Sequence, residues 1–270
     1  MLEGRPRLPM WTCPGAPKMI SSGLMPWDFA LILILLATAV PWLGRRRVRQ
    51  LLQSPETTKS DRLRLYASTI ASQWIITAVI IWRSSARGIT GPSLGLAIPS
   101  FPLTAAVSAV LAALIFANQL LSLRLLALRP SKAQGILPRL ALRIFPQDAA
   151  ERLAFFAVVV TVATCEELIY RGFVQHVLDS WAGNMVAAGI LGSAIMFALA
   201  HVYQGRRGLA STFLVGLLFA IVRFWTGSLL PSLVAHFVAD LTVGLLAPSR
   251  IRKALAILRD SSDESRAGAS

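Results

Sequence analysis

The feature that most constrains this chain is a series of long apolar stretches, each followed by a short polar or basic segment. Several of them run for about 16–20 residues with almost no charge, which is enough for a helix to cross a hydrocarbon core of about 30 Å. The whole chain is 55% hydrophobic with a mean hydropathy of +0.61, more apolar than an ordinary soluble domain. The stretches therefore predict an all-α, polytopic transmembrane helix bundle.

We expect about seven membrane spans, with eight as the alternative count. The last four carry charged or histidine side chains inside apolar sequence, which the first three do not. The expected spans are Asp28–Leu43, Leu65–Trp82, Pro102–Leu123, Leu153–Leu178, Met185–Tyr203, Leu209–Trp225 and Ser228–Ala247.

The basic residues gather in alternate segments between the spans. A formal net charge of +14 would also suit a nucleic-acid binder, but this distribution is the positive-inside pattern of a membrane protein. We therefore exclude nucleic acid as a partner and expect the lipid bilayer instead. The protein is predicted to be a multi-pass integral membrane protein of the bacterial plasma membrane, with a cytoplasmic C-terminus. The basic segments are 44–64, 129–152, 204–208 and the tail after 248.

The same pattern divides the chain into five parts. The Pro- and Gly-rich N-terminus is expected to be disordered, and so is the polar end, Ser261–Ser270. No small-residue cleavage site follows the first apolar run, so we expect no cleavable signal peptide. The parts are a disordered segment 1–26, N-terminal transmembrane helices 27–128, a cytoplasmic basic linker 129–152 with a short amphipathic segment, a core 153–248 that carries the polar motifs, and a cytoplasmic tail 249–270.

Charges inside the fourth span are the second constraint. Glu166, Glu167 and Arg171 lie within six positions of one another, and a charge at membrane depth costs about 2.5–3.5 kcal/mol on insertion scales. Glu167 and Arg171, at i and i+4, share a helix face and can pair. Glu166 points about 100° away and is free to act as a general base. The structural alternative is a Glu–Arg pair that only pins helices together.

Two later spans carry further polar side chains. His201 follows Phe197 by four residues near the end of the fifth span, and His236 and Asp240 stand at i and i+4 in the seventh. With a rise of about 1.5 Å per residue, His201 and Glu166 reach a similar height on either side of their turn. The seventh span brings its pair toward the same level. Three helices are therefore predicted to meet at one polar cavity, with an interhelical hydrogen bond as the structural alternative.

Two other reactive side chains lie in the fourth span. His176 is ten residues beyond Glu166, toward the outer end, and we give it a structural role. Cys165 neighbours the motif, but a thiol buried among apolar side chains is a poor nucleophile. Cys13 and Cys165 lie far apart in unlike settings, so we predict neither a disulfide framework nor a CxxC zinc site.

Together the three motifs resemble those of the CPBP family of intramembrane proteases, also called the CAAX protease or Abi family, which includes the Rce1-type prenyl-protein endopeptidase. The family pattern is EExxxR, then FxxxH, then HxxxN or a variant. The resemblance covers roughly residues 150–247, so the core 153–248 is expected to be a CPBP-like protease core. The motifs read Glu166-Glu167-Leu-Ile-Tyr-Arg171, Phe197-Ala-Leu-Ala-His201 and His236-Phe-Val-Ala-Asp240.

The resemblance implies an endopeptidase that hydrolyses a peptide bond near the C-terminus of a peptide or protein substrate at the membrane. That substrate is a prenylated protein in the eukaryotic relatives, and a bacterial peptide or another membrane protein is the alternative. Glu166 and His201 would activate a water molecule, and His236 with the residue at 240 would stabilise the oxyanion. These roles suit the residue types, because a carboxylate can accept a proton and hydrogen-bond donors can stabilise developing charge.

The resemblance also assigns Glu167 and Arg171 to ordering the site. Position 240 departs from the pattern, since Asp240 stands where Asn is common. An ionised aspartate cannot donate a hydrogen bond to an oxyanion. Asp240 must therefore be protonated, orient His236 or bind a metal.

Metal use and the enzymatic function itself have alternatives. The family is labelled a metalloprotease but the HExxH motif is absent, and His201, His236 and Glu166 or Asp240 are the residues that would form a zinc site with an open position. A glutamate mechanism with no required cofactor uses the same residues, and we favour it.

The non-enzymatic alternative is a membrane scaffold or immunity-type protein of the same fold. A proton-coupled transporter is less favoured, because we find neither internal repeats nor broken helices.

Overall fold

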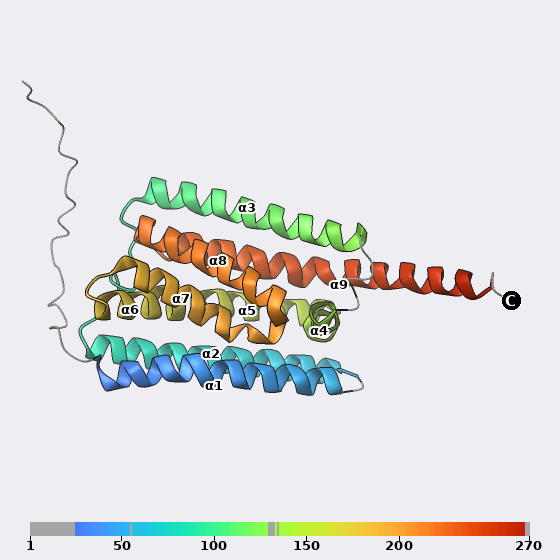
Figure 1. The fold of residues 1–270 in the computed structure, drawn as a ribbon, viewed down its shortest axis with the longest axis horizontal. Helices are drawn as coiled ribbons and strands as arrows, with labels where there is room; N and C mark the ends of the chain where they lie inside the picture. The colour runs from blue at the N-terminus through green and yellow to red at the C-terminus, as the bar shows by residue number, and fades with distance from the viewer. Residues whose placement is uncertain (1–24, 55, 129–132, 134, 268–270) are drawn as a thin grey trace, which may run out of the picture.

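The computed structural model describes residues 25–54, 56–128, 133 and 135–267, and the regular structure in these residues is entirely helical (Figure 1). Among them, six helices are long and apolar enough to cross a membrane, and a further apolar helix, Val186–Ala200, is shorter. The predicted polytopic helix bundle is confirmed, and the protein is a multi-pass integral membrane protein.

The helices follow the predicted spans but extend beyond most of them. They are α1 (Trp27–Gln53), α2 (Lys59–Ala86), α3 (Phe101–Leu128), α4 (Ile136–Ile144), α5 (Ala149–Glu166), a π-helical segment (Glu167–Val174), α6 (Gln175–Trp181), α7 (Val186–Ala200), a 3-10 turn (Val202–Gln204), α8 (Gly205–Thr226) and α9 (Leu230–Ala267).

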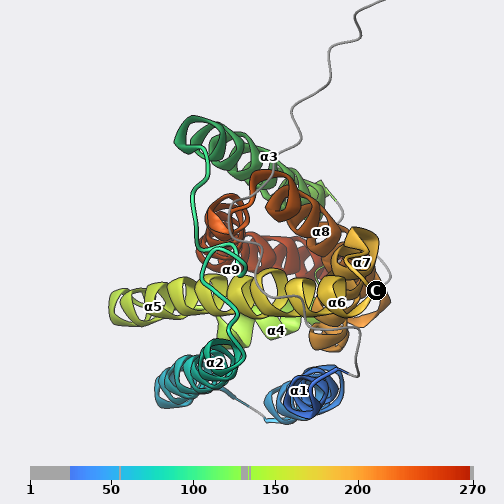
Figure 2. The same ribbon diagram turned by 90° about the vertical axis from the view of Figure 1, so that its left-hand side faces the viewer.

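The helix formed by α5, the π-helical segment and α6 lies in the middle of the bundle. Figures 1 and 2 show α1 and α2 on one side of it and α3, α8 and α9 on the other. α5 packs against both α2 and α9, while α3 packs along α9 and α7 along α8. Side chains near the end of α5 can therefore meet residues from both sides of the bundle.

The short helix α4 crosses the others, and in Figure 1 it is seen end-on while the long helices run across the view. It is amphipathic, with Leu140 and Ala141 buried. Its Arg143 donates from Nη1 to the carbonyl oxygens of Leu51 (2.8 Å) and Ser54 (2.6 Å), at the end of α1. This is the amphipathic segment predicted within 129–152, and its shape suits a helix that lies in the membrane surface.

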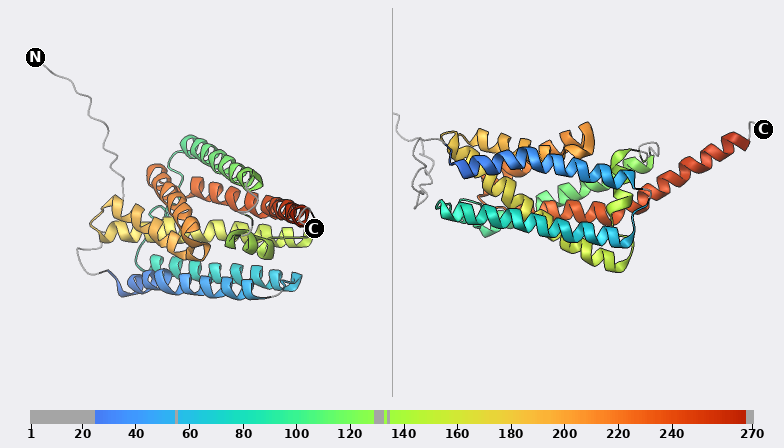
Figure 3. Two further views of the ribbon diagram at one scale, coloured as in Figure 1. Left: turned by 45° about the vertical axis from the view of Figure 1, so that its right-hand side comes forward. Right: turned by 90° about the horizontal axis from the view of Figure 1, so that it is seen from below.

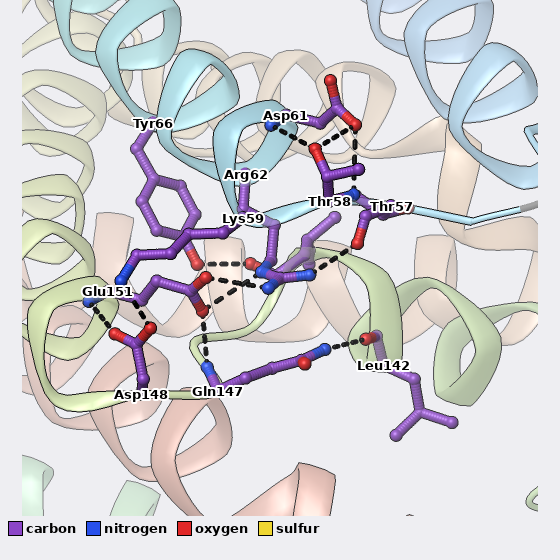
Figure 4. A network of polar contacts seen from close by, with 11 residues as sticks. Thr57, Thr58, Lys59, Asp61, Arg62, Tyr66, Leu142, Gln147, Asp148 and Glu151 are labelled. Atoms are coloured by element: carbon purple, nitrogen blue, oxygen red, sulfur yellow. Dashed lines mark hydrogen bonds and ion pairs between the residues drawn. The ribbon is translucent and has the colours of Figure 1, made fainter.

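A polar network joins the start of α2 to the connection between α4 and α5 (Figure 4). The Arg62 guanidinium donates to both carboxylate oxygens of Glu151, at 2.8 and 3.1 Å, and both side chains are buried. The Tyr66 hydroxyl donates to the carbonyl oxygen of Ile144 at 2.6 Å. A bidentate Arg–carboxylate pair fixes geometry as well as contributing energy. The network therefore fixes the register of α2 against α5.

The predictions for the ends of the chain have different outcomes. The segment 1–26, for which disorder is predicted, lies outside the described residues apart from its last two residues. The predicted disorder from Ser261 is wrong as far as Ala267, because α9 continues that far and extends past the other helices (Figure 3). Between Ser249 and Ala267 the sequence contains no Gly or Pro, the two strongest helix breakers.

Candidate active site

A cavity of about 630 Å³ lies among α1, α2, α4, α5 and α9. Most of its walls are apolar side chains, and polar groups gather where α5 ends. Four of the predicted site residues line it, namely Glu166, His201, His236 and Asp240, whereas Glu167 and Arg171 do not. The structure thus brings the three motifs together as predicted from their spacing.

Glu166, the last residue of α5, faces the two histidines. Its Oε2 atom lies 3.9 Å from Nε2 of His201 and 3.9 Å from Nε2 of His236. This buried oxygen has no hydrogen-bond partner among the described residues. A separation of 3.9 Å is too long for a direct hydrogen bond but suits groups that share a water molecule.

His201 ends α7 and is oriented by the backbone of its own helix. Its Nδ1 lies 2.8 Å from the carbonyl oxygen of Phe197. A carbonyl oxygen can only accept, so Nδ1 carries the hydrogen and Nε2 of the neutral ring presents a lone pair to Glu166. Phe197 is buried, as expected for core packing, and its ring centroid lies 4.6 Å from that of His201.

His236 is oriented in the same manner, but by a carboxylate. Its Nδ1 lies 2.9 Å from Oε1 of Glu167. Its Nε2 faces Oε2 of Glu166 and lies 3.6 Å from Oδ2 of Asp240. The second distance exceeds that of a hydrogen bond. Glu167, rather than Asp240, therefore holds the ring of His236 in place.

Glu167 and Arg171 form the predicted pair, with Nη1 and Oε1 3.0 Å apart and both side chains fully buried. The guanidinium carbon of Arg171 lies 3.9 Å from the ring centroid of Phe197 and 5.3 Å from that of Phe219. Such cation–π contacts help to stabilise a desolvated cation. Oε1 of Glu167 also contacts His236, so the pair supports the histidine from outside the cavity.

A π-helical segment begins at Glu167, directly after the carboxylate that faces the cavity. Single π-turns inside α-helices occur frequently at functional sites. The widened turn alters the backbone bonding, and the Ser193 hydroxyl from α7 donates to the Tyr170 carbonyl oxygen at 2.8 Å. Gly172 allows a close approach here, since a Cβ at this position would lie 3.0 Å from the carbonyl oxygen of Leu94.

Comparison with known proteins identifies the family of this segment. Residues 148–242 match a family model described as Rce1-like, Type II CAAX prenyl endopeptidase. This segment is Rce1-like. The resemblance predicted from the motifs is therefore confirmed for about a third of the chain, and it contains all three of them. At the family level, this match supports a CAAX-type intramembrane protease. No curated protein and no solved structure matches the chain.

Sequence reasoning missed a contact between α2 and the Rce1-like site. Gln73 on α2 donates from Nε2 to Oε1 of Glu166 at 3.0 Å. Tyr203 and Gln204, in the turn after His201, also line the cavity. A single amide inside an apolar span is a recognisable signal, because polar side chains in membrane helices tend to hydrogen-bond across to a neighbouring helix. The sequence does not indicate which helix that would be.

The two reactive side chains set aside in the sequence do not line the cavity around the Rce1-like motifs. Cys165 is fully buried, so a thiol nucleophile at this position would not reach a substrate in the cavity. His176 lies half-buried on α6, beyond the π-helical segment.

The residues considered as zinc ligands do not form a three-ligand site in this arrangement. With bonds of about 2.0–2.1 Å, neighbouring ligands of a tetrahedral zinc ion lie about 3.3 Å apart. Oε2 of Glu166 is 3.9 Å from each histidine nitrogen. In the described part of the chain, no group of three His, Cys, Asp or Glu side chains is close enough to hold one ion.

Proposed function

We propose that this protein is a CAAX-type intramembrane endopeptidase that hydrolyses a peptide bond in a membrane-associated substrate, for which a prenylated protein is one candidate, using a water molecule activated by Glu166 and His201. The main observation behind the proposal is that Oε2 of Glu166 lies 3.9 Å from Nε2 of His201 and 3.9 Å from Nε2 of His236. The family match of residues 148–242 supports the reaction class.

The attacking water would lie between Glu166 and His201. A water about 2.8 Å from Oε2 and from Nε2 bridges a gap of 3.9 Å with a bent geometry. The water donates one hydrogen to the Glu166 carboxylate and the other to the His201 lone pair. Its own lone pair then points away from both residues, toward the substrate carbonyl carbon. Holding the water in this geometry removes much of the entropic cost of attack.

The reaction proceeds in two steps. As the water oxygen bonds to the carbonyl carbon, Glu166 takes the proton and the carbonyl oxygen becomes an oxyanion. When the C–N bond breaks, Glu166 returns that proton to the leaving nitrogen. The second water hydrogen stays on the new carboxyl group and then passes to the amine through solvent, so the products are a carboxylate and an ammonium group, and the enzyme is restored. General acid–base catalysis of this kind contributes about 10²–10⁴-fold to the rate.

We assign oxyanion stabilisation to His236. In its protonated form it donates from Nε2 to the oxyanion, while Glu167 on Nδ1 balances the positive charge. Asp240 contacts the same nitrogen at 3.6 Å. An ionised Asp240 cannot itself donate a hydrogen bond. We therefore propose that its negative charge helps to balance the positive charge of protonated His236. No cofactor takes part in this scheme.

The rest of the cavity suits an apolar substrate. Its walls away from the polar end include Leu140, Ile144, Phe145 and Val243. An apolar chain enters such a site favourably because its surface leaves water. From the positive-inside pattern we propose that α4 and the C-terminus face the cytoplasm, in a bacterial plasma membrane.

The test uses purified protein in lipid vesicles and a quenched fluorescent peptide ending in a farnesylated CAAX sequence, alongside a library of unmodified peptides. We expect wild type to cleave the farnesylated peptide and Glu166→Gln and His201→Ala to lose at least about 10²-fold in kcat. Glu56→Gln removes an exposed carboxylate and serves as the matched control, with unchanged activity.

Three results would contradict the proposal. Full activity of Glu166→Gln would remove the carboxylate from the mechanism. Activity that a strong chelator abolishes and zinc restores would require a metal in place of the side-chain scheme. A folded wild-type protein that cleaves none of the peptides would favour the scaffold or immunity-type function.

A further inference from the structure

We infer that Gln73 is a positioning residue for Glu166: its side-chain amide holds one carboxylate oxygen so that the other faces the water site. The inference rests on the proposed function. Gln73 lies on α2, outside the segment 148–242 that matches the Rce1-like family. It would therefore extend the functional site beyond that segment.

The contact itself is well defined. Nε2 of Gln73 and Oε1 of Glu166 are 3.0 Å apart, and both side chains line the same cavity. An ionised carboxylate only accepts hydrogen bonds, so the amide must present its NH₂ group. Oε2 of Glu166 is left without a hydrogen-bond partner among the described residues. The two oxygens of this carboxylate thus have different surroundings.

This difference has a direct consequence for the geometry of the base. Rotation about the last side-chain torsion of a glutamate is broad and weakly restricted. A donor on Oε1 sets the plane of the carboxylate, and in that plane Oε2 lies 3.9 Å from both histidine nitrogens. Without the donor, the carboxylate is free to turn Oε2 away from the water. Gln73 would therefore act on the chemical step through Glu166.

The neighbouring carboxylate shows why an amide suits this position. Glu167 is paired with the guanidinium of Arg171, and a cation so placed neutralises the carboxylate. The Glu166 side chain has instead a neutral donor within hydrogen-bond distance. A neutral amide can orient a carboxylate without placing a full positive charge beside it. The carboxylate that is proposed to accept a proton is thus the one held by an amide.

A second side chain of α2 supplies a matched control. The indole Nε1 of Trp74 donates to the Thr161 hydroxyl on α5 at 3.3 Å. This bond also joins α2 to α5, but neither residue lines the cavity. Trp74→Phe therefore removes an interhelical hydrogen bond without changing the surroundings of Glu166.

The experiment measures kcat and KM for the farnesylated peptide with wild type, Gln73→Met, Gln73→His and Trp74→Phe, together with the thermal unfolding of each. Gln73→Met keeps the length of the side chain without a donor, and Gln73→His keeps a ring N–H at a similar reach. We expect Gln73→Met to lower kcat roughly 10- to 100-fold, the effect of losing a hydrogen bond to a charged group. KM should change little, and Gln73→His and Trp74→Phe should retain most of the activity.

Equal kcat values for Gln73→Met and Trp74→Phe would overturn the inference, because any effect would then be structural. A loss in Gln73→His as large as that in Gln73→Met would overturn it too, since a donor would not restore function. The failure of the proposed function looks different, as wild type itself would then be inactive.

A spectroscopic measurement tests the contact independently of activity. In infrared spectra of protein with ¹³C-labelled glutamate, subtraction of the Glu166→Gln spectrum isolates the carboxylate stretch of Glu166. We expect this band to shift in Gln73→Met, since it loses a hydrogen bond, and to keep its position in Trp74→Phe. An unchanged band in Gln73→Met would show that the amide does not hold Glu166.

Discussion

Glu166 and Glu167 are adjacent in sequence but have opposite surroundings. The Glu166 side chain is 13% exposed and opens on the cavity, while Glu167 is fully buried beside the Arg171 guanidinium. Consecutive residues on a helix point about 100° apart, so Glu166 can face the cavity while Glu167 contacts the buried side chains behind it. Of the two adjacent glutamates, Glu166 is thus the proposed base, and Glu167 holds Arg171 and His236 in place.

Because the two glutamates have different surroundings, we expect a change from Glu to Gln to lower stability much more at position 167 than at position 166. Glu167→Gln leaves the buried guanidinium of Arg171 without a counter-charge, so we expect it to lower the free energy of unfolding by about 3–5 kcal/mol. Glu166→Gln keeps an acceptor for Gln73 and leaves the buried Glu167–Arg171 pair intact, so its effect should stay within about 1 kcal/mol. Thermal unfolding in detergent, followed by circular dichroism, compares the two. Similar losses in both variants would contradict this expectation.

Side chains that violate the apolar pattern of the spans could be found from the sequence. Glu166, His201 and His236 stand out because charged and histidine side chains are costly in a membrane, and their spacing along three helices predicted that they meet. Gln73 could not be assigned to Glu166, because no spacing rule relates residues on α2 and α5. The bond from Glu167 to His236 was also missed, since pairing with Arg171 already accounted for that carboxylate.

At the scale of the elements, the π-helical segment is the feature that sequence reasoning could not supply. Apolar periodicity distinguishes helix from strand, but it does not distinguish a π-turn from α-helix within one span. The fourth span was therefore predicted as a uniform helix. Its π-helical part lies where Glu167, Arg171 and Gly172 contact the rest of the bundle.

Packing around this segment leaves no room for a side chain at Gly172. A Cβ there would lie 3.0 Å from the Leu94 carbonyl oxygen, which belongs to backbone and cannot turn aside. We expect Gly172→Ala to destabilise the protein by about 1–3 kcal/mol through overpacking. Gly91→Ala is the control, because its Cβ would meet Leu96 at an ordinary 3.8 Å. Equal unfolding temperatures of the two variants would show that the loop before α3 can move away.

At the scale of the whole molecule, the N-terminal helices complete a cavity that the Rce1-like segment does not enclose by itself. α1, α2 and α4 supply much of its lining, yet they precede the matched residues 148–242. Their positions along the chain were predicted, since the length of an apolar stretch indicates a span. Their packing was not, because apolar spans of similar composition carry little information about which neighbour they contact.

The network of Figure 4 is expected to hold these helices against the core. Arg62→Met leaves the fully buried carboxylate of Glu151 without its cation, so we expect a loss of about 3–5 kcal/mol in the free energy of unfolding. Lys59→Met is the control, because the Lys59–Asp148 pair is about half exposed and such pairs contribute about 0–1 kcal/mol. Thermal unfolding of both variants tests this. A larger effect of Lys59→Met would contradict it.

The hydrogen bond between Gln73 and Glu166 closes a loop of 93 positions along the chain. Contacts between such distant residues form only after the intervening chain has been ordered, because closing the loop costs conformational entropy. During synthesis, a chain with only its early helices inserted holds the amide but not yet the carboxylate. The proposed base would therefore acquire this orienting contact only once α5 has packed against α2, so a nascent chain that ends before α5 would lack both the carboxylate and its orientation.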